Sequence, residues 1–356
     1  MIRKHIKLFI LGLVSFILFF GLTIYSNCRI SGQSEQGMAK QWSSKGGYAQ
    51  VSCYFEASAG VNENTIRYFE NSLSNTLVQE SIVAPTESAR LYIDAYSGIG
   101  SVYIQGNKGS GSFQTIGVGG DFFRFHELNL IYGDYFDTNG LMKDYILIDK
   151  ETAWQLFGSV NVVGMQVTIG GKSYRVSGVI ERDRDKYAKS GGLEPKTVYM
   201  PYSEMESNGN VSSIMAYEIV MPNPISNYAK DKVKSGLSVS EENVDVIENS
   251  KRFTIVPLLQ VLKTLAVRSM KTSSIVYPYW ENEARAVENI LAVILLFRII
   301  FLLIPTVLLV ILIVHLWRHK KWGKKEVKDL LEKLLLFLKQ LILRPFRKRI
   351  QKDNKE

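Results

Sequence analysis

The side chains that could do chemistry are few and scattered. The four histidines of the chain are His5, His126, His315 and His319. Their spacing matches neither a zinc site nor a Ser-His-Asp arrangement. The glycine-rich stretch 106–111 (Gly-Asn-Lys-Gly-Ser-Gly) does not place its lysine as a phosphate-binding loop does. We therefore expect no catalytic residue, no metal site and no cofactor, and we expect that this chain does not hydrolyse ATP itself.

Two long uncharged runs, one near each end of the chain, flank the region between them. The run 8–28 has 21 residues and the run 299–317 has 19, with further apolar residues leading in from 290. A helix rises about 1.5 Å per residue, so each run reaches roughly 30 Å, the thickness of the hydrocarbon core of a bilayer. Backbone groups in lipid must pair within their own segment, so both runs should be helical. The sequence predicts transmembrane helices over 8–28 and 289–317.

The net charge of +9 lies at the two ends of the chain. Residues 1–7 and 318–356 together carry +12, whereas residues 8–317 carry −3. The positive-inside rule places such basic flanks in the cytoplasm. We expect a two-pass protein of the cell membrane with a cytoplasmic N-terminus (1–7), an extracytoplasmic domain (29–288) and a basic cytoplasmic tail (318–356). Nucleic-acid binding loses its support, because the domain itself is not basic.

The first run also has the basic start and apolar core of a signal peptide. It is longer than a usual signal-peptide core, and no pair of small residues marks a cleavage site after it. We therefore favour an uncleaved membrane anchor.

Between the two runs, the apolar pattern switches between period 2 and period 3.6, which is typical of an α+β domain. We expect strands at 48–55, 89–95, 101–105, 112–118, 145–148, 167–169, 174–179, 197–200, 216–221 and 244–248, and helices at 62–77, 150–157, 225–236 and 256–270. The stretch 97–100 (Ser-Gly-Ile-Gly) predicts a hairpin turn. Residues 137–205 have their own pattern of short strands, which predicts a small subdomain inserted between two units of strands and helix.

Motifs in the middle of this domain carry a family resemblance. They are Gly120-Asp121-Phe122-Phe123, Leu130-Ile131-Tyr132-Gly133-Asp134-Tyr135-Phe136, Ile146-Leu147-Ile148-Asp149, Leu156-Phe157-Gly158, Val162-Val163-Gly164, Tyr174-Arg175-Val176 and Gly178-Val179-Ile180. In order and spacing they resemble the MacB-like periplasmic core domain, best over 115–205 and more broadly over 45–250. That domain belongs to permease subunits of the MacB/FtsX kind of ABC transporter.

The resemblance implies a porter-like layer of βαβ units outside the membrane, interrupted by the small strand-rich subdomain. It also implies an ABC ATPase subunit and a sister permease as partners. Permeases of this family continue through several more spans, whereas here one span and a basic tail follow the domain. We therefore expect a shortened, half-size or accessory subunit with only two spans.

The tail repeats apolar residues at helical spacing, which predicts an amphipathic helix over 325–343. Its apolar face includes Leu330, Leu334, Phe337, Leu338 and Leu341. This helix could lie on the inner leaflet, with the arginines that follow it on anionic headgroups. It could also dock on a cytoplasmic ATPase or a sister subunit, and the two interpretations are compatible, although we favour the first.

An aromatic cluster, Tyr277, Tyr279 and Trp280, comes just before the second span. Aromatic residues there are typical of a belt at the outer headgroups. A second interpretation makes the cluster the joint that couples movement of the domain to the membrane helix. Arg298 either reaches the headgroups at the outer boundary of the span or pairs with a helix of a partner subunit. These four residues are our candidates for membrane coupling.

Cys28 and Cys53 both fall on the outside, where a disulfide between them is permitted, although Cys28 adjoins the membrane. For the whole protein we expect a non-enzymatic, permease-like subunit of an ABC-type transport or mechanotransmission system. The alternative is a membrane-tethered sensor or scaffold whose outer domain binds a ligand or an envelope component. Neither interpretation identifies the transported substrate.

Overall fold

The computed structural model describes residues 2–44, 46–84, 86, 89–181, 196–211, 213–268 and 274–319. The expected tail helix, with Leu330, Leu334, Phe337, Leu338 and Leu341, lies outside the described residues. The chain divides into two compact units. One unit joins the residues up to Thr23 with those from Phe297 onward, and the other is Ile24–Leu296. Each is described by itself.

The helices are α1 (Ile2–Ser31), α2 (Met38–Trp42), α3 (Glu63–Gln79), α4 (Phe122–Phe125), α5 (Lys150–Phe157), α7 (Tyr202–Ser207), α8 (Tyr228–Gly236), α9 (Ile255–Arg268) and α10 (Tyr279–His319). Four short 3-10 turns are η1 (Ser34–Gly37), η2 (Ala57–Ala59), η3 (Glu241–Asn243) and η4 (Asn249–Lys251). The strands are β1 (Tyr48–Phe55), β2 (Ile93–Gln105), β3 (Ser110–Gly120), β4 (Leu130–Gly133), β5 (Tyr145–Asp149), β6 (Gln166–Ile169), β7 (Lys172–Ile180), β8 (Thr197–Pro201), β9 (Ala216–Pro222) and β10 (Val244–Glu248).

The first unit consists of apolar helix. Lys7–Ser31 and Tyr279–His315 are long and apolar enough to cross a membrane, which confirms two candidate spans. Their side chains in this unit are largely exposed, as lipid-facing residues must be in a structure without lipid. Pro305 lies inside α10 without ending it. Arg298 of α10 lies over the ring of Phe19 of α1, 5.8 Å from its centroid.

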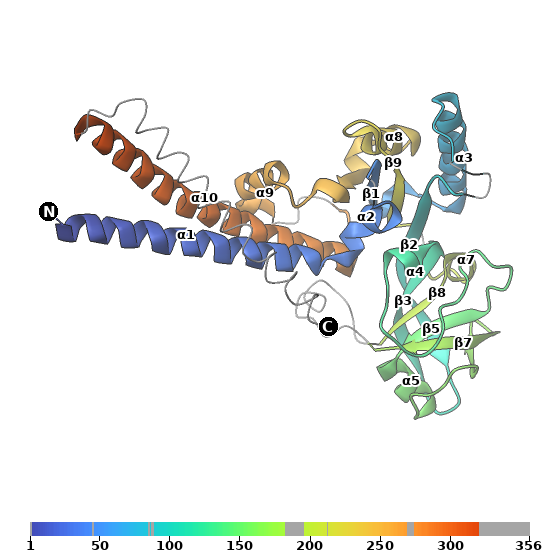
Figure 1. Ribbon diagram of the computed structural model, residues 1–356. Helices are drawn as coiled ribbons and strands as arrows, with labels where there is room; N and C mark the ends of the chain where they lie inside the picture. The colour runs from blue at the N-terminus through green and yellow to red at the C-terminus, as the bar shows by residue number, and fades with distance from the viewer. Residues whose placement is uncertain are drawn as a thin grey trace, which may run out of the picture. The chain divides into compact units, whose positions relative to one another are not determined.

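The second unit is a mixed α/β domain built on one ten-stranded sheet (Figure 1). The sheet order begins β10-β1-β9-β2, with antiparallel neighbours throughout. Strands β1 and β2 are therefore parallel with β9 between them, and α3 connects them. Strands β9 and β10 are related in the same way through α8. These are two interleaved split βαβ units.

The segment between the two split units extends the same sheet. The long hairpin β2–β3 leads to β8 by parallel pairing and then to β5, β7 and β4. Strand β6 closes back on β2 and β7. These strands and α5 have their own apolar cluster, separate from the one that α3 and α8 form on β1 and β9. The strands of the predicted subdomain at 137–205 belong to the same sheet as the rest of the domain, so they do not mark it off as a separate unit. The inserted subdomain therefore stays a prediction.

Most of the expected strands and helices are present, with bounds that differ by a few residues. The helix α3 begins at a capping box in which Asn62 accepts from the Thr65 N–H. Asp149 caps α5 through the Thr152 N–H, and Gly158 ends that helix at φ 67°.

The predicted hairpin at 89–105 is wrong, because residues 93–105 form one continuous strand, β2. The glycines that suggested a turn are there because α7 and the residues after it pack closely. A Cβ on Gly98 would meet the Tyr202 ring at 2.8 Å, and one on Gly100 would meet the Asn210 carbonyl oxygen at 2.0 Å. The chain turns later, at 106–109, between β2 and β3.

Candidate functional site

Six charged side chains meet where β10, η4 and α9 contact the first turns of α10. We call them the charge network, and they are Asp245, Arg252, Arg268, Glu281, Arg285 and Glu288. Glu281, Arg285 and Glu288 are spaced by four and three residues, so they share one face of α10. The network carries three positive and three negative groups, so burying it leaves no net charge.

Arg252, directly after η4, lies at the centre of the network and is 3% exposed. Its two terminal nitrogens donate to the two Glu281 oxygens, each at 2.8 Å, and its Nε donates to Glu288 Oε1 at 2.7 Å. This fork geometry is the strongest that an arginine makes with carboxylates. Burial alone would lower the pKa of Arg252, but Glu281 and Glu288 raise it well above the ordinary value.

The outer arginines complete the pairing of the two buried glutamates. Arg285 Nε donates to Glu281 Oε1 at 2.8 Å, and its Nη2 donates to Asp245 Oδ2 on β10 at 2.6 Å. Arg268, the last residue of α9, pairs with Glu288. Each buried carboxylate of α10 therefore has two cationic partners, and at least one of these comes from outside α10.

Uncharged groups tie the network to the sheet and to the segment after α1. Tyr54 of β1 donates to Glu281 Oε2 at 3.1 Å. Arg252 Nη1 also donates to Gln36 Oε1 of η1 at 3.1 Å. Gln33, before η1, donates to Glu283 Oε1 at 3.3 Å. The beginning of α10 is thus bonded to β1, to β10 and to the chain that leaves α1.

A buried histidine forms a second polar cluster beside the network. His126, at the end of α4, pairs with Glu218 of β9 through Nε2 and lies 3.4 Å from Glu35 Oε1 through Nδ1. Ser52 Oγ donates to Glu218 Oε1 at 2.8 Å. Burial alone would lower the pKa of His126, but Glu218 and Glu35 raise it to about 10. The imidazole is therefore a cation at neutral pH.

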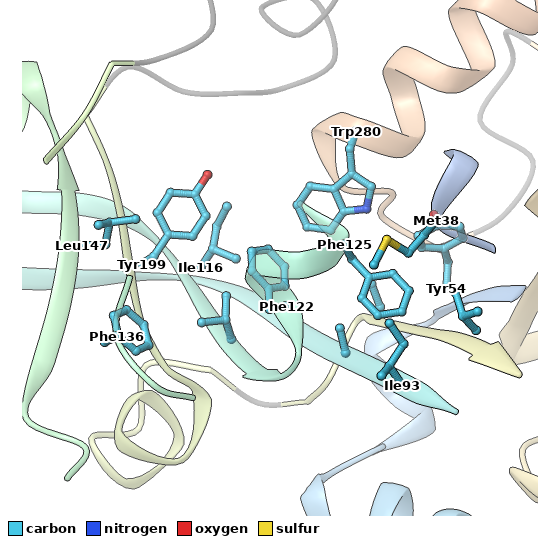
Figure 2. Close-up of a cluster of buried hydrophobic side chains, with 14 of the residues drawn as sticks. Met38, Tyr54, Ile93, Ile116, Phe122, Phe125, Phe136, Leu147, Tyr199 and Trp280 are labelled. Atoms are coloured by element: carbon cyan, nitrogen blue, oxygen red, sulfur yellow. The ribbon is translucent and has the colours of Figure 1, made fainter. Parts of the chain in front are cut away.

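Trp280 packs on this histidine and is 1% exposed. The two ring centroids are 4.3 Å apart, which suits a cation on the face of an indole. Figure 2 shows Trp280 reaching from the start of α10 toward Phe122 and Phe125 in the apolar cluster of the domain. The first turn of α10 is therefore part of the core of the domain.

The structure accordingly brings three predicted coupling residues into the domain. Tyr277 donates to Asp245 Oδ2 at 2.9 Å, and the Tyr279 hydroxyl lies 3.5 Å from that of Tyr199. A headgroup belt needs exposed rings, so that interpretation is wrong for Trp280. Arg298 is not among these contacts and belongs to the other unit. A coupling role for the four residues stays a prediction.

Cys28 and Cys53 are both free thiols, so the permitted disulfide is not formed. Cys28 is exposed on α1, whereas Cys53 is buried in β1 among the residues beneath α3 and α8. Burial raises the pKa of the Cys53 thiol, which makes it unreactive.

Sequence reasoning missed the charge network and the histidine cluster. One signal was present for the network: Glu281, Arg285 and Glu288 stand at helical spacing directly before an apolar span, where unpaired charges are costly. No signal identified Arg252 as their partner.

A polar cavity of about 540 Å³ lies elsewhere in the domain, between α3 and β2. The carboxyl groups of Glu70 and Asp94 hydrogen-bond to each other in its wall, and Tyr217 donates to Asp94 Oδ2 at 2.9 Å. Burial and the Asp94 carboxyl raise the pKa of Glu70 to about 8. Among the described residues, no group of three or more His, Cys, Asp or Glu side chains could hold a metal ion.

Sequence comparisons identify relatives of this domain. The family model of the MacB-like periplasmic core domain matches residues 10–230. The macrolide export ATP-binding/permease protein MacB of Agrobacterium fabrum is 36% identical over 90 residues, which are 24% of this chain and 13% of that protein. The protein of the same name from Vibrio parahaemolyticus is 28% identical over 92 residues, 25% of this chain and 14% of that protein. The match thus spans about one seventh of the length of these relatives.

Solved structures give weaker likenesses. The extracellular domain of the noncanonic ABC-type transporter YknZ aligns with a TM-score of 0.38 and 15% identity, over 56% of this chain and 99% of that one. The periplasmic region of MacB from Actinobacillus actinomycetemcomitans aligns with a TM-score of 0.38 and 16% identity, over 59% of this chain and 93% of that one. The family-model match covers more than half of the chain, so the chain belongs to the MacB-like periplasmic core domain family.

Proposed function

We propose that this chain is a non-enzymatic, permease-like membrane subunit of an ABC-type transport or mechanotransmission system, in which a separate partner hydrolyses ATP. The family and the two candidate spans support a membrane subunit with an extracytoplasmic domain. The observation that carries the mechanical role is the burial of Trp280 and Glu281 in the domain, at the start of the helix that becomes the second span.

In this mechanism the first turns of α10 move together with the domain. Glu281 and Glu288 are held by arginines from outside the helix, and Trp280 is enclosed by Phe122 and His126. Separating α10 from the sheet would leave the buried charges of the network without their partners, which has a high cost in free energy. A rotation or tilt of the domain is therefore carried into α10, and movement of α10 is carried into the domain.

Co-purification from native membranes in mild detergent tests the subunit assignment. We expect the full chain to recover an ABC ATPase and a permease-like sister, identified by mass spectrometry and dependent on the tagged chain. A preparation that repeatedly recovers neither would refute the assignment.

The ATPase rate of that complex tests the mechanical role separately. Trp280→Phe removes part of the contact at the root of α10, whereas Trp154→Phe makes the same change on the exposed face of α5. We expect the first variant to keep its partners and its fold but to lower the ATPase rate, and the second to leave the rate unchanged. Equal rates in both variants would contradict coupling through this joint without affecting the subunit assignment.

The alternative, a tethered sensor or scaffold, has one observation in its favour. The polar cavity beside Glu70 and Asp94 is large enough for a small ligand and is lined by charged and tyrosine side chains. Thermal stabilisation of the full chain by an envelope component, reduced by Asp94→Asn and independent of any ATPase, would favour this function.

A further inference from the structure

The segment that contains α9 has an unusual composition. Residues 249–271 include five basic residues and not one acid: Lys251, Arg252, Lys263, Arg268 and Lys271. The helix α9 itself is predominantly apolar, reading Ile-Val-Pro-Leu-Leu-Gln-Val-Leu-Lys-Thr-Leu-Ala-Val-Arg. Basic charge combined with an apolar helix and no acids is the composition of helices that lie on anionic membrane surfaces.

One face of α9 packs on α10. Leu258 is buried in a cluster with Val287, Leu291 and Leu295, and Val261 is also buried. Arg268 fixes the end of α9 to Glu288. These contacts account for one stripe of the helix.

A second apolar stripe has no contact of this kind. Ile255 is 62% exposed and Val256 66% exposed, and Val267 is also exposed. Lys263 lies between them around the helix, and its long stem can extend along an apolar surface while its charge reaches headgroups. The polar side of the helix is narrow and carries Gln260 and Thr264.

The contacts with α10 fix where this stripe lies along that helix. Arg252, before α9, and Arg268, at its end, both pair with Glu288, and Leu258 lies in one cluster with Leu291 and Leu295. Glu288 directly precedes the predicted span 289–317, so these contacts hold α9 at the outer boundary of that span. An exposed apolar face at that level meets lipid rather than bulk water.

We propose that α9 is an interfacial helix that rests on the outer leaflet, with Ile255, Val256 and Val267 inserted at the boundary of headgroups and acyl chains and Lys263 on anionic headgroups. Continuity with the apolar span of α10, and an exposed apolar stripe that carries Lys263 and no acid, select the bilayer as the occupant. The helix would hold the root of α10 at a fixed depth. This inference does not depend on the ATPase partner.

Spin labelling of the full chain in nanodiscs of phosphatidylcholine and phosphatidylglycerol tests it. Cys28→Ser removes the exposed thiol, and the buried Cys53 remains. Nitroxides are then placed singly at Ile255→Cys and Val256→Cys. Thr264→Cys is the control for Ile255→Cys on the same helix, because it lies nine residues later and hence on the opposite side from Ile255.

Two further sites calibrate the measurement: Leu303→Cys in the uncharged run and Tyr68→Cys on the exposed surface of α3. We expect the labels at 255 and 256 to resemble Leu303→Cys, with oxygen accessibility several-fold above that of a water-soluble nickel complex. The Thr264→Cys label should resemble Tyr68→Cys.

Two outcomes would overturn the proposal. Labels at 255 and 256 that resemble Tyr68→Cys would place the stripe in water. Labels with low accessibility to both reagents would mean that protein covers it, either a second copy of this chain or a sister subunit. Unchanged thermal unfolding of each labelled variant establishes that the fold is intact.

Discussion

Replacing Arg252 by methionine tests whether the charge network holds α10 in the domain. Arg252→Met keeps an unbranched apolar stem but removes the guanidinium and its five hydrogen bonds, two of them to Glu281 and one each to Glu288, Gln36 and Asn249. Glu281 keeps Arg285 as a partner and Glu288 keeps Arg268, yet one buried negative charge is left uncompensated. Breaking a buried ion pair in this way costs about 3–5 kcal/mol.

The loss should be visible in thermal unfolding of the full chain in detergent, followed by tryptophan fluorescence. For a domain of this size, 1 kcal/mol shifts Tm by about 2–4 °C, so we expect a decrease of about 6–20 °C. The matched control is Lys234→Met in α8, whose ion pair with Glu241 is on the surface. Exposed pairs contribute about 1 kcal/mol or less, so the control should shift Tm by less than about 4 °C.

A double variant separates charge balance from the mere loss of contacts. Arg252→Met combined with Glu288→Gln removes one positive and one negative charge, which restores a balanced network and leaves only Arg268, near the surface, without its partner. We expect the double variant to regain part of the stability that the single variant loses. A single variant within 2 °C of the wild type, or a double variant that is simply additive, would refute the reasoning.

Three further predictions concern the rest of the domain. Trp280→Ala should cost about 3–5 kcal/mol in urea unfolding because it empties a buried site, whereas Trp154→Ala on the exposed face of α5 should cost less than about 1 kcal/mol. Because the folded-state pKa of Glu70 is raised from 4.5 to about 8, the wild type should lose stability relative to Glu70→Gln as the pH rises from 4.5 to 8. After allowance for solvent screening the effect is on the order of 1 kcal/mol, and parallel pH profiles of the two proteins would contradict it. One thiol, Cys28, should react with a thiol reagent in the native protein and two after unfolding, with no effect of reductant on Tm, whereas a loss of stability in reductant would indicate a disulfide.

The parts of the fold that depend on neighbouring residues could be predicted from the sequence. The caps at Asn62 and Asp149 and the left-handed Gly158 each follow from a side chain or backbone preference within a few residues. The hairpin prediction failed at Gly98 and Gly100 for the opposite reason. A side chain at either position would clash with Tyr202 or Asn210, which are about a hundred positions later in the chain. No local pattern distinguishes a glycine required by close packing from one required by a turn.

The candidate site depends almost wholly on distant pairs. Arg252 and Gln36 are 216 residues apart in sequence, and Tyr54 and Glu281 are 227 apart. A charged residue before an apolar span could equally well contact lipid headgroups. Its protein partner therefore cannot be inferred from the sequence without knowing the order of the strands. What placed Arg252 beside Glu281 is the sheet order, in which β10 lies next to β1 and so brings η4 to the root of α10.

The same contacts bind the domain-side ends of both membrane helices into one body. The segment after α1 reaches α10 through Gln33 and Glu283, reaches the charge network through Gln36, and approaches His126 through Glu35. Sliding the end of α10 against the sheet would break buried ion pairs, which costs several kcal/mol once a partner is lost. Sliding the segment after α1 would break its hydrogen bonds to Glu283 and Arg252. Thermal motion rarely supplies that energy, so in the proposed mechanism a change driven by a partner would move the sheet and both helix ends together. The movement would then bend the chain where fewer ion pairs and hydrogen bonds hold it. Variants of the charge network should release the two helices from the domain under conditions in which the domain itself stays folded.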